Sequence, residues 1–232
     1  MTEIYFIRHG QASFGSDNYD CLSDRGICQS ELLGDYFKRL NICFQAVYSG
    51  PLERQIHTAE IVTGQMNPGG GPGLCITEKF DEFDAEAMIA SQMDDMVRED
   101  PSLEAAAAGF ESDFDSFKLL FDRAIKRMMD GRSNEAENLE AFINAVRKGI
   151  DQVVRENGTL KKIAVFTSGG TISAVMQQAL KLAPEETVRL GWEIYNTSVS
   201  IFNCGNNRLD LKVFNSVAHL ELNQDPDLIT YL

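Results

Sequence analysis

Short apolar runs alternate with stretches of helical periodicity along most of the chain. The runs 4–7, 44–48 and 163–166 are rich in apolar, aromatic and β-branched residues and are followed by glycine-containing turns, which is typical of buried strands. After the first run, Ser23 is the expected N-cap of a helix whose apolar positions continue to about Leu40. Strands that alternate with helices predict an α/β fold with a layered sheet.

The middle and the end of the chain add another helix, a third strand and a hairpin. Pro51 is expected in the first turn of a helix over 52–63, and 75–77 is expected as a strand. The segments 198–204 and 209–214 alternate in polarity around a turn, which predicts an antiparallel pair. The sheet is therefore expected to be mixed, although mainly parallel.

A long central stretch, 85–155, carries few strand signals and is rich in Ala, Glu, Met and Leu. We interpret it as a helical insertion at about 85–132, followed by one helix over 136–155 that covers the sheet. The chain has 232 residues, of which 44% are hydrophobic, and this is enough for one α/β core. We expect a single domain, 1–232, that carries this insertion.

Charge and cysteine content narrow the possible partners. The formal net charge of −14 argues against sequence-independent nucleic-acid binding and requires any anion site to be a local concentration of arginine. No apolar stretch is long enough for a bilayer, and the N-terminus lacks the pattern of a secretory signal. The five scattered cysteines form no C-x-x-C pair and indicate neither a zinc site nor a disulfide framework. A cytoplasmic protein without nucleic-acid or membrane partners is expected.

Three turns that follow predicted strands carry candidate chemistry. Arg8 and His9 follow the strand at 4–7, Arg54 lies in the first turn of the helix after the strand at 44–48, and Ser168 follows the strand at 163–166. If the strands are parallel, these turns open on one edge of the sheet, where α/β proteins bind ligands. Arginine binds phosphate through its planar fork, and neutral histidine is a nucleophile near neutral pH. Backbone N–H groups of Gly169 and Gly170 are expected to add donors.

Five motifs along the chain resemble those of the histidine phosphatase superfamily, which includes the cofactor-dependent phosphoglycerate mutases. They are Arg8-His9-Gly10, Leu22-Ser23-x-x-Gly26-x-x-Gln29, Ser49-x-x-Leu52-x-Arg54-x-x-His57-Thr58-Ala59, Asn196-Thr197-Ser198-Val199 and His219-Leu220. The fold that the resemblance implies is a three-layer α/β/α sandwich with a helical insertion over the site.

The resemblance implies covalent phosphoryl transfer. His9 would be the nucleophile and become phosphorylated, while Arg8 and Arg54 would hold the phosphoryl oxygens. An acidic residue would protonate the leaving oxygen, and water would then hydrolyse the phosphohistidine. This chemistry needs neither a metal nor a cofactor, and the sequence shows no metal-ligand spacing.

Two positions depart from the superfamily pattern. Ser168 stands where relatives carry a second histidine, and a neutral hydroxyl in place of a cation would weaken catalysis, since one preorganised donor is worth roughly 10²–10³ in rate. Glu82 lies at the distance from the third strand where relatives carry the proton donor and is the expected donor, although the Gly-x-Trp-Glu-Gly-like run of relatives is missing here. The alternative is that Glu82 is one member of a solvated acidic cluster. His57 is expected to be structural, and His219 is left open between a structural hydrogen bond and a place in the site.

The predicted site has a catalytic and a binding set. The catalytic set is Arg8, His9, Arg54, Glu82 and Ser168, and the set that binds phosphate or substrate is Arg8, Gly10, Gln11, Asn18, Ser23, Arg54, Gly169 and His219. The favoured function is hydrolysis of a phosphomonoester in a small phosphorylated metabolite or a phosphoprotein. The sequence does not fix the oligomeric state, and a homodimer is left open.

Three other functions are weighed against it. Ser168 in place of histidine favours a weakly active or non-catalytic member that binds a phosphorylated ligand. A phosphoglycerate mutase is less favoured, because the substrate-gripping insertions of that branch are not recognisable here. An esterase with Ser168 as nucleophile is the weakest reading, since the first glycine of G-x-S-x-G is missing.

Overall fold

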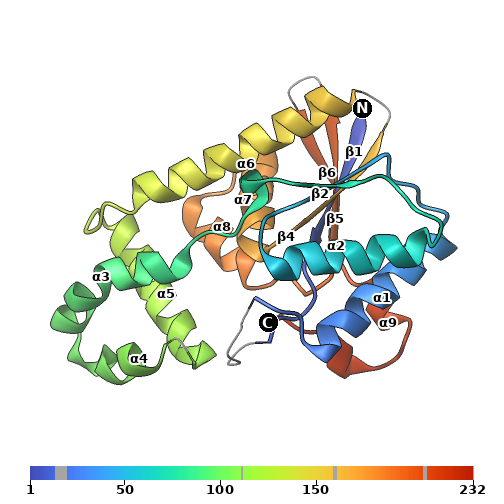
Figure 1. Cartoon of the computed structure of the whole chain (residues 1–232). Coiled ribbons are helices and arrows are strands. Elements are labelled where there is room, and N and C mark those ends of the chain that lie inside the picture. The colour runs from blue at the N-terminus through green and yellow to red at the C-terminus, as the bar shows by residue number, and fades with distance from the viewer. Residues whose placement is uncertain (14–19, 111, 159–160, 206–207, 232) are drawn as a thin grey trace. The chain divides into compact units, whose positions relative to one another are not determined.

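The computed structural model describes residues 1–13, 20–110, 112–158, 161–205 and 208–231 (Figure 1). These residues form two compact units, which are taken separately. The first comprises described residues of 1–13, 20–82 and 145–231, and it holds the sheet. The second comprises described residues of 83–144 and is helical. The interpretation of the chain as a single domain stays a prediction.

The sheet of the first unit has six strands among the described residues, in the order β3-β2-β4-β1-β5-β6. Strands β3, β2, β4 and β1 run parallel, and β5 is antiparallel to both β1 and β6. The prediction of a mixed, mainly parallel sheet is therefore confirmed. The strands are β1 Thr2–Arg8, β2 Ala46–Ser49, β3 Leu74–Ile76, β4 Lys162–Thr167, β5 Val199–Gly205 and β6 Arg208–Ser216.

Helices cover both faces of this sheet, which confirms the expected layered sandwich. Figure 1 shows α1 and α2 on one side and α6 and α7 on the other. The helices with residues in this unit are α1 Asp24–Arg39, α2 Glu53–Met66, α6 Ala136–Asn157, α7 Gly169–Leu180, α8 Pro184–Gly191 and α9 Ala218–Glu221, with two short 3₁₀ turns, η1 Glu78–Phe80 and η3 Pro226–Leu228. Of the helices described, none is both long and apolar enough to cross a membrane.

The N-terminal end of α1 is capped as predicted, whereas that of α2 is not. Ser23 is the N-cap of α1, as predicted, and its Oγ accepts from the backbone N of Gly26. The prediction for Pro51 is wrong, because α2 begins two residues later, at Glu53. Leu52 is the N-cap and has no side-chain acceptor, so the carboxylate of Asp20 takes the hydrogen bond from the backbone N of Glu53 at 2.8 Å.

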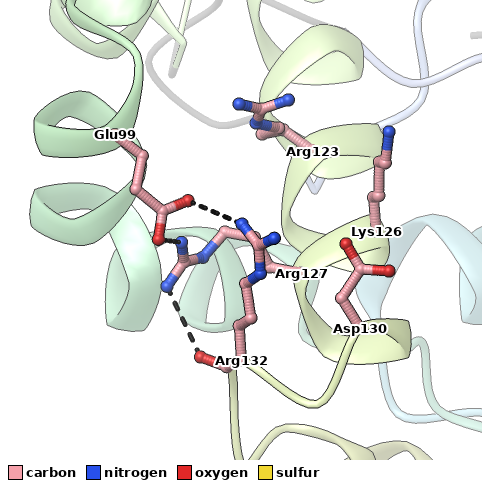
Figure 2. A pocket seen from close by; sticks show the side chains of 6 residues that line it. All are labelled: Glu99, Arg123, Lys126, Arg127, Asp130 and Arg132. Atoms are coloured by element: carbon pink, nitrogen blue, oxygen red, sulfur yellow. Dashed lines mark hydrogen bonds and ion pairs between the residues drawn. The ribbon is translucent and has the colours of Figure 1, made fainter.

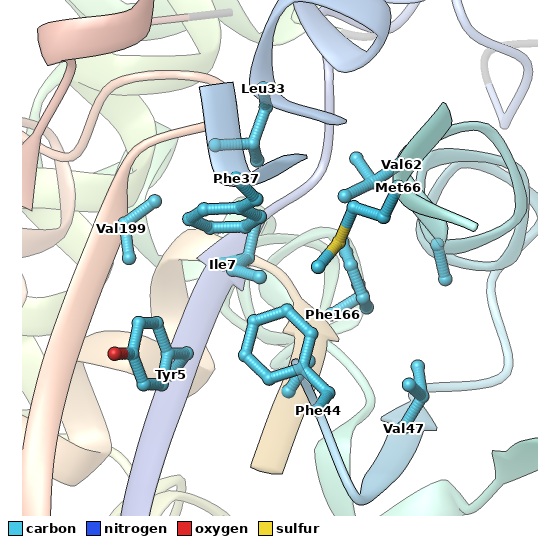
Figure 3. Packing of buried hydrophobic residues seen from close by; sticks show 12 residues of the cluster. Tyr5, Ile7, Leu33, Phe37, Phe44, Val47, Val62, Met66, Phe166 and Val199 are labelled. Atoms are coloured by element: carbon cyan, nitrogen blue, oxygen red, sulfur yellow. The ribbon is translucent and has the colours of Figure 1, made fainter. Parts of the chain in front are cut away.

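The two faces of β1 are buried in different layers. Tyr5 and Ile7 pack with Phe37 of α1 and Val62 of α2 in one hydrophobic cluster (Figure 3). Phe6 points to the opposite layer, where its ring meets the edge of Phe80 at 6.1 Å between centroids. A one-residue shift of β1 would exchange these layers, so burial fixes the register that places Arg8 and His9 at its carboxyl end.

The second unit contains α3 Ala85–Glu99, η2 Pro101–Leu103, α4 Glu104–Gly109 and α5 Phe114–Met129, which agrees with the helical insertion expected there. Arg127 of α5 forms ion pairs with Glu99 and with Asp95, the latter at 3.2 Å. Arg132 lies 3.6 Å from the same Glu99 (Figure 2). Because the Arg127 side chain is only 5% exposed, these carboxylates compensate a buried charge and join α3 to α5.

Candidate active site

Three strand ends meet at one edge of the sheet, as the sequence predicts. The central strand β4 lies between β1 and β2, all three are parallel, and Arg8 is paired with Thr167. The turns that follow the three strands therefore share an edge. The backbone N of His9 donates to Thr167 O at 2.9 Å, and that of Gly50 donates to Phe166 O at 3.0 Å.

His9 is buried at this edge, with 3% of its surface exposed. Its Nδ1 lies 2.7 Å from the carbonyl oxygen of Gly10, which can only accept, so Nδ1 carries the proton. Its Nε2 then keeps a lone pair and accepts from Nε of Arg54 at 3.2 Å. Burial, Arg54 and Arg8, in that order, hold the pKa of His9 well below its ordinary value. The imidazole is thus a neutral base with a defined tautomer.

Arg54 is held from two sides. Its Nε faces His9, and its Nη1 lies 2.8 Å from Oδ1 of Asp20. The same Asp20 carboxylate accepts from the backbone N of Glu53 at 2.8 Å and of Arg54 at 3.4 Å, so it is fixed at the start of α2. Asp20 was not among the predicted site residues, since no pattern distinguishes it among the 35 acidic residues of the chain.

Arg8 lies beside the start of α7. Its Nη1 donates to the carbonyl oxygen of Ile194, and a Cβ built at Gly169 would lie 3.8 Å from its Nε. Together with its effect on the pKa of His9, this places both predicted arginines around the imidazole. The structure thus brings Arg8, His9, Arg54 and Gly169 together at one edge.

Gly10 is required by a close approach of two backbones. Its N donates to Thr58 Oγ1 at 3.0 Å, and a Cβ at this position would lie 2.4 Å from the carbonyl oxygen of Gly26. A Cβ at Gly26 would in turn lie 2.2 Å from Gln11 O. These contacts explain the glycine of the Arg8-His9-Gly10 motif by packing between the loop after β1 and the start of α1.

Gln11 and Ser23 bind each other. Ser23 Oγ donates to Gln11 Oε1 at 3.0 Å, and the N of Gln11 donates to Gln29 Oε1 at 2.9 Å. The contacts join the loop after His9 to α1, and the contribution of both residues to substrate binding stays a prediction. Asn18, also predicted to bind substrate, lies outside the described residues.

Two neighbouring carboxyl groups lie where the proton donor is expected. Glu82 Oε2 accepts from Gly170 N at 3.3 Å, so this N–H, expected as a ligand donor, is turned to Glu82. Asp81 Oδ1 accepts from Glu82 N at 2.7 Å. Burial raises the pKa of the Asp81 carboxyl above its ordinary value, although Arg54 opposes the shift. Asp81 is a second acid that the sequence placed only in a charged cluster.

Ser168 is fully buried and accepts a hydrogen bond from Gln55. The distance from Gln55 Nε2 to Ser168 Oγ is 2.7 Å, and neither side chain has exposed surface. In the sequence, 112 residues separate this pair, and no motif pointed to Gln55. The Thr167 hydroxyl beside Ser168 donates to Phe80 O at 2.7 Å.

The other two histidines lie at different depths. His219 is 3% exposed, its Nε2 lies 2.9 Å from Thr197 Oγ1, and burial lowers its pKa from 6.5 to about 3. The backbone N of Thr197 donates to His9 O at 3.2 Å. The contacts of His219 therefore support the backbone behind His9, and its role in binding phosphate stays a prediction. His57 is half-buried on α2.

Within the described residues, no group of three or more His, Cys, Asp and Glu side chains is arranged to hold a metal ion.

Solved structures with the same fold include both mutases and phosphatases. Phosphoglycerate mutase from Bacillus anthracis shares 16% identity with a TM-score of 0.63, over 97% of each chain. A mutant phosphoserine phosphatase from Entamoeba histolytica, in complex with phosphoserine, shares 19% identity with a TM-score of 0.56, over 95% of this chain and 100% of that one. The alpha-ribazole phosphatase from Shigella flexneri shares 18% identity with a TM-score of 0.56, over 93% and 96%.

No curated protein sequence shows a significant match to this chain. The sequence does match the profile of the histidine phosphatase superfamily (branch 1), over residues 4–217. This match spans the motifs around Arg8, Arg54 and Asn196, and it confirms the resemblance drawn from them. The chain therefore belongs to the histidine phosphatase superfamily.

Proposed function

We propose that this protein hydrolyses phosphomonoesters through a phosphohistidine formed at His9. The observation that carries the proposal is the 3.2 Å hydrogen bond from Arg54 Nε to the lone pair of His9 Nε2. A neutral imidazole beside two arginines can attack a phosphorus atom whose oxygens those arginines bind. In a chain of net charge −14, this local positive charge is what attracts a dianion.

The reaction proceeds in two displacements. In the first, the lone pair of His9 Nε2 forms a bond to phosphorus, and the bond from phosphorus to the leaving oxygen breaks. The leaving oxygen takes its electron pair and receives a proton from a carboxyl group. In the second, water attacks phosphorus, the carboxylate takes the proton of that water, and the electron pair of the N–P bond returns to Nε2. Arg8 and Arg54 stabilise the charge on the phosphoryl oxygens in both steps.

Glu82 is the proposed proton donor, and Asp81 is the alternative. Burial shifts the pKa of Asp81 upward, which is the direction that a proton donor needs, whereas Glu82 follows from the superfamily pattern. The Glu82→Gln and Asp81→Asn variants separate them on two substrates. Loss of the donor slows an alkyl phosphate far more than p-nitrophenyl phosphate, because nitrophenolate leaves without a proton.

The proposed substrate is a small phosphorylated metabolite, although a phosphoprotein has the same reacting group. Support for a metabolite comes from phosphoserine and alpha-ribazole phosphatases of the same fold. The test is a panel of phosphoserine, 3-phosphoglycerate, p-nitrophenyl phosphate and phosphopeptides, assayed with wild type and His9→Ala. Phosphate release that the variant loses supports the proposal, and equal release by the two proteins overturns it. A mutase would instead isomerise 3-phosphoglycerate without net release of phosphate, so the carbon products of that reaction are analysed as well.

A second candidate is a phospholigand-binding protein with little turnover. It is favoured by Ser168, which is uncharged and accepts its hydrogen bond from an amide. Binding of phosphoserine or phosphate without turnover of any member of the panel would identify this function. The esterase reading loses support, because no histidine nitrogen is hydrogen-bonded to Ser168 among the described residues.

A further inference from the structure

Gln55 connects the helix that carries Arg54 with the segment that carries the two acids. Its Nε2 donates to Ser168 Oγ at 2.7 Å and to Phe80 O at 3.4 Å, and its Oε1 accepts from Leu52 N at 3.2 Å. All three partners lie in turns at the carboxyl edge of the sheet, and the Gln55 side chain has no exposed surface. A buried amide with every polar group bonded has one defined orientation.

The backbone groups around Gln55 fix which end of the amide points where. Leu52 N can only donate and therefore faces Oε1, whereas Phe80 O can only accept and therefore faces Nε2. Ser168 Oγ then accepts a hydrogen bond from Nε2. The buried Ser168 hydroxyl is therefore connected to α2 through Gln55.

The segment Phe80–Glu82 is anchored at each residue. Phe80 O accepts from Gln55 Nε2 and from Thr167 Oγ1, and Asp81 O accepts from Thr171 Oγ1. The carboxylate of Glu82 accepts from Gly170 N. The threonine and glycine contacts come from β4 and the start of α7, whereas the Gln55 contact comes from α2, directly after Arg54.

We propose that Gln55 is a positioning residue that, by binding Phe80 O and Ser168 Oγ together, holds the acids Asp81 and Glu82 in place relative to Arg54 and His9. This inference rests on the proposed function, since it assigns Gln55 to the proton-donating half of that reaction. Because the polar groups of its side chain are bonded to Leu52, Phe80 and Ser168, Gln55 is assigned no contact with the substrate. Its effect is therefore specific to proton transfer, which depends steeply on the placement of the acid.

The test compares Gln55→Met with Gln65→Met, the same exchange near the far end of α2. We expect Gln55→Met to lower kcat/KM for an alkyl phosphate at least about tenfold more than for p-nitrophenyl phosphate, with KM nearly unchanged. Gln55→Glu keeps the acceptor for Leu52 N but loses the donor to Phe80 O, so it should show the same selective loss. Equal losses on both substrates, or full activity of Gln55→Glu, overturn the inference while leaving the phosphatase function in place.

Hydrogen exchange gives a readout that needs no turnover. In Gln55→Met, the amides of the peptide over 78–84 should exchange faster than in wild type, whereas Gln65→Met should leave them unchanged. Unaltered exchange in a Gln55→Met protein that melts cooperatively contradicts the positioning role. A wild type that turns over no phosphoester refutes the proposed function instead, so the two failures are distinguishable.

Discussion

The Nε atom of Arg54 donates to Nε2 of His9 across 3.2 Å, so the arginine and the lone pair of the nucleophile face each other directly. A protonated imidazole could not accept this bond, and the positive charge of Arg54 opposes protonation. The arrangement keeps His9 neutral and places the cation beside the nitrogen that would attack phosphorus.

Replacing Asp20 with asparagine is expected to tighten the binding of inorganic phosphate. The Asp20 carboxylate partly neutralises Arg54, and asparagine keeps the size and one of the two acceptor oxygens while removing the charge. Because the Asp20 side chain is 33% exposed, the effect is modest, about two- to fivefold in the inhibition constant of phosphate, or roughly 0.5–1 kcal/mol. Asp24→Asn, on the first turn of α1, is the control. An unchanged or weaker inhibition constant would refute the charge argument.

Adding one methyl group at Gly10 should impair both folding and activity. The new Cβ would lie 2.4 Å from the backbone oxygen of Gly26, so Gly10→Ala is expected to cost about 1–3 kcal/mol of unfolding free energy. Gly64→Ala in α2 meets nothing within 4 Å and should stabilise by about 0.5–1 kcal/mol. Urea denaturation of both variants measures this difference in unfolding free energy. Equal changes in the two variants would show that the close approach of Gly10 to Gly26 does not limit stability.

A histidine at position 168 is expected to raise kcat/KM only if Gln55 is also replaced with a smaller residue. Gln55 Nε2 lies 2.7 Å from Ser168 Oγ and both side chains are buried, so an imidazole has no space. Ser168→His alone should lower both melting temperature and kcat/KM, and Ser168→His with Gln55→Ala should recover activity relative to it. The coupling free energy from the double-mutant cycle should exceed about 1 kcal/mol. If kcat/KM of Ser168→His alone equals that of the double variant, Gln55 does not obstruct the imidazole and this explanation is excluded.

The buried His219 predicts a loss of stability in acid. Burial lowers its pKa from 6.5 to about 3, so between these values the unfolded chain binds a proton that the folded chain does not. The contribution of neutral His219 to the unfolding free energy is complete above pH 6.5. It falls by about 2 kcal/mol on going to pH 5, at about 1.4 kcal/mol per pH unit. His219→Gln should reduce the difference in unfolding free energy between pH 7 and pH 5 by that amount, measured by urea denaturation. An equal difference in both proteins would be inconsistent with a neutral, buried His219.

The local patterns of the sequence predicted most of the fold. The apolar runs that became β1 and β4 have alternating residues buried in two layers, and this burial leaves few alternatives for their register. The helix α2 was expected from Leu52, with Pro51 in its first turn, whereas it begins at Glu53. The acceptor that caps it is Asp20, more than thirty residues earlier. A local capping pattern cannot reveal such a partner.

The same limitation applies to the site. Arg8, His9 and Arg54 are recognisable from short motifs, because Arg8 and His9 lie at the end of β1 and Arg54 lies in the first turn of the helix that follows β2. Asp20 and Gln55 are not, since their partners Arg54 and Ser168 lie far from them in the sequence and meet them only in the folded sheet. The raised pKa of Asp81 likewise follows from burial, which a run of acidic residues does not predict.

The central claim is that His9 carries the phosphoryl group during turnover. The direct measurement is a rapid quench with a turned-over phosphoester, followed by digestion at alkaline pH and mass spectrometry of the peptide that contains His9. We predict a gain of one phosphoryl group on His9 that mild acid removes and that is absent from His9→Ala. Steady turnover without a phosphoryl group on His9, or a phosphoryl group on Ser168 instead, would contradict the account.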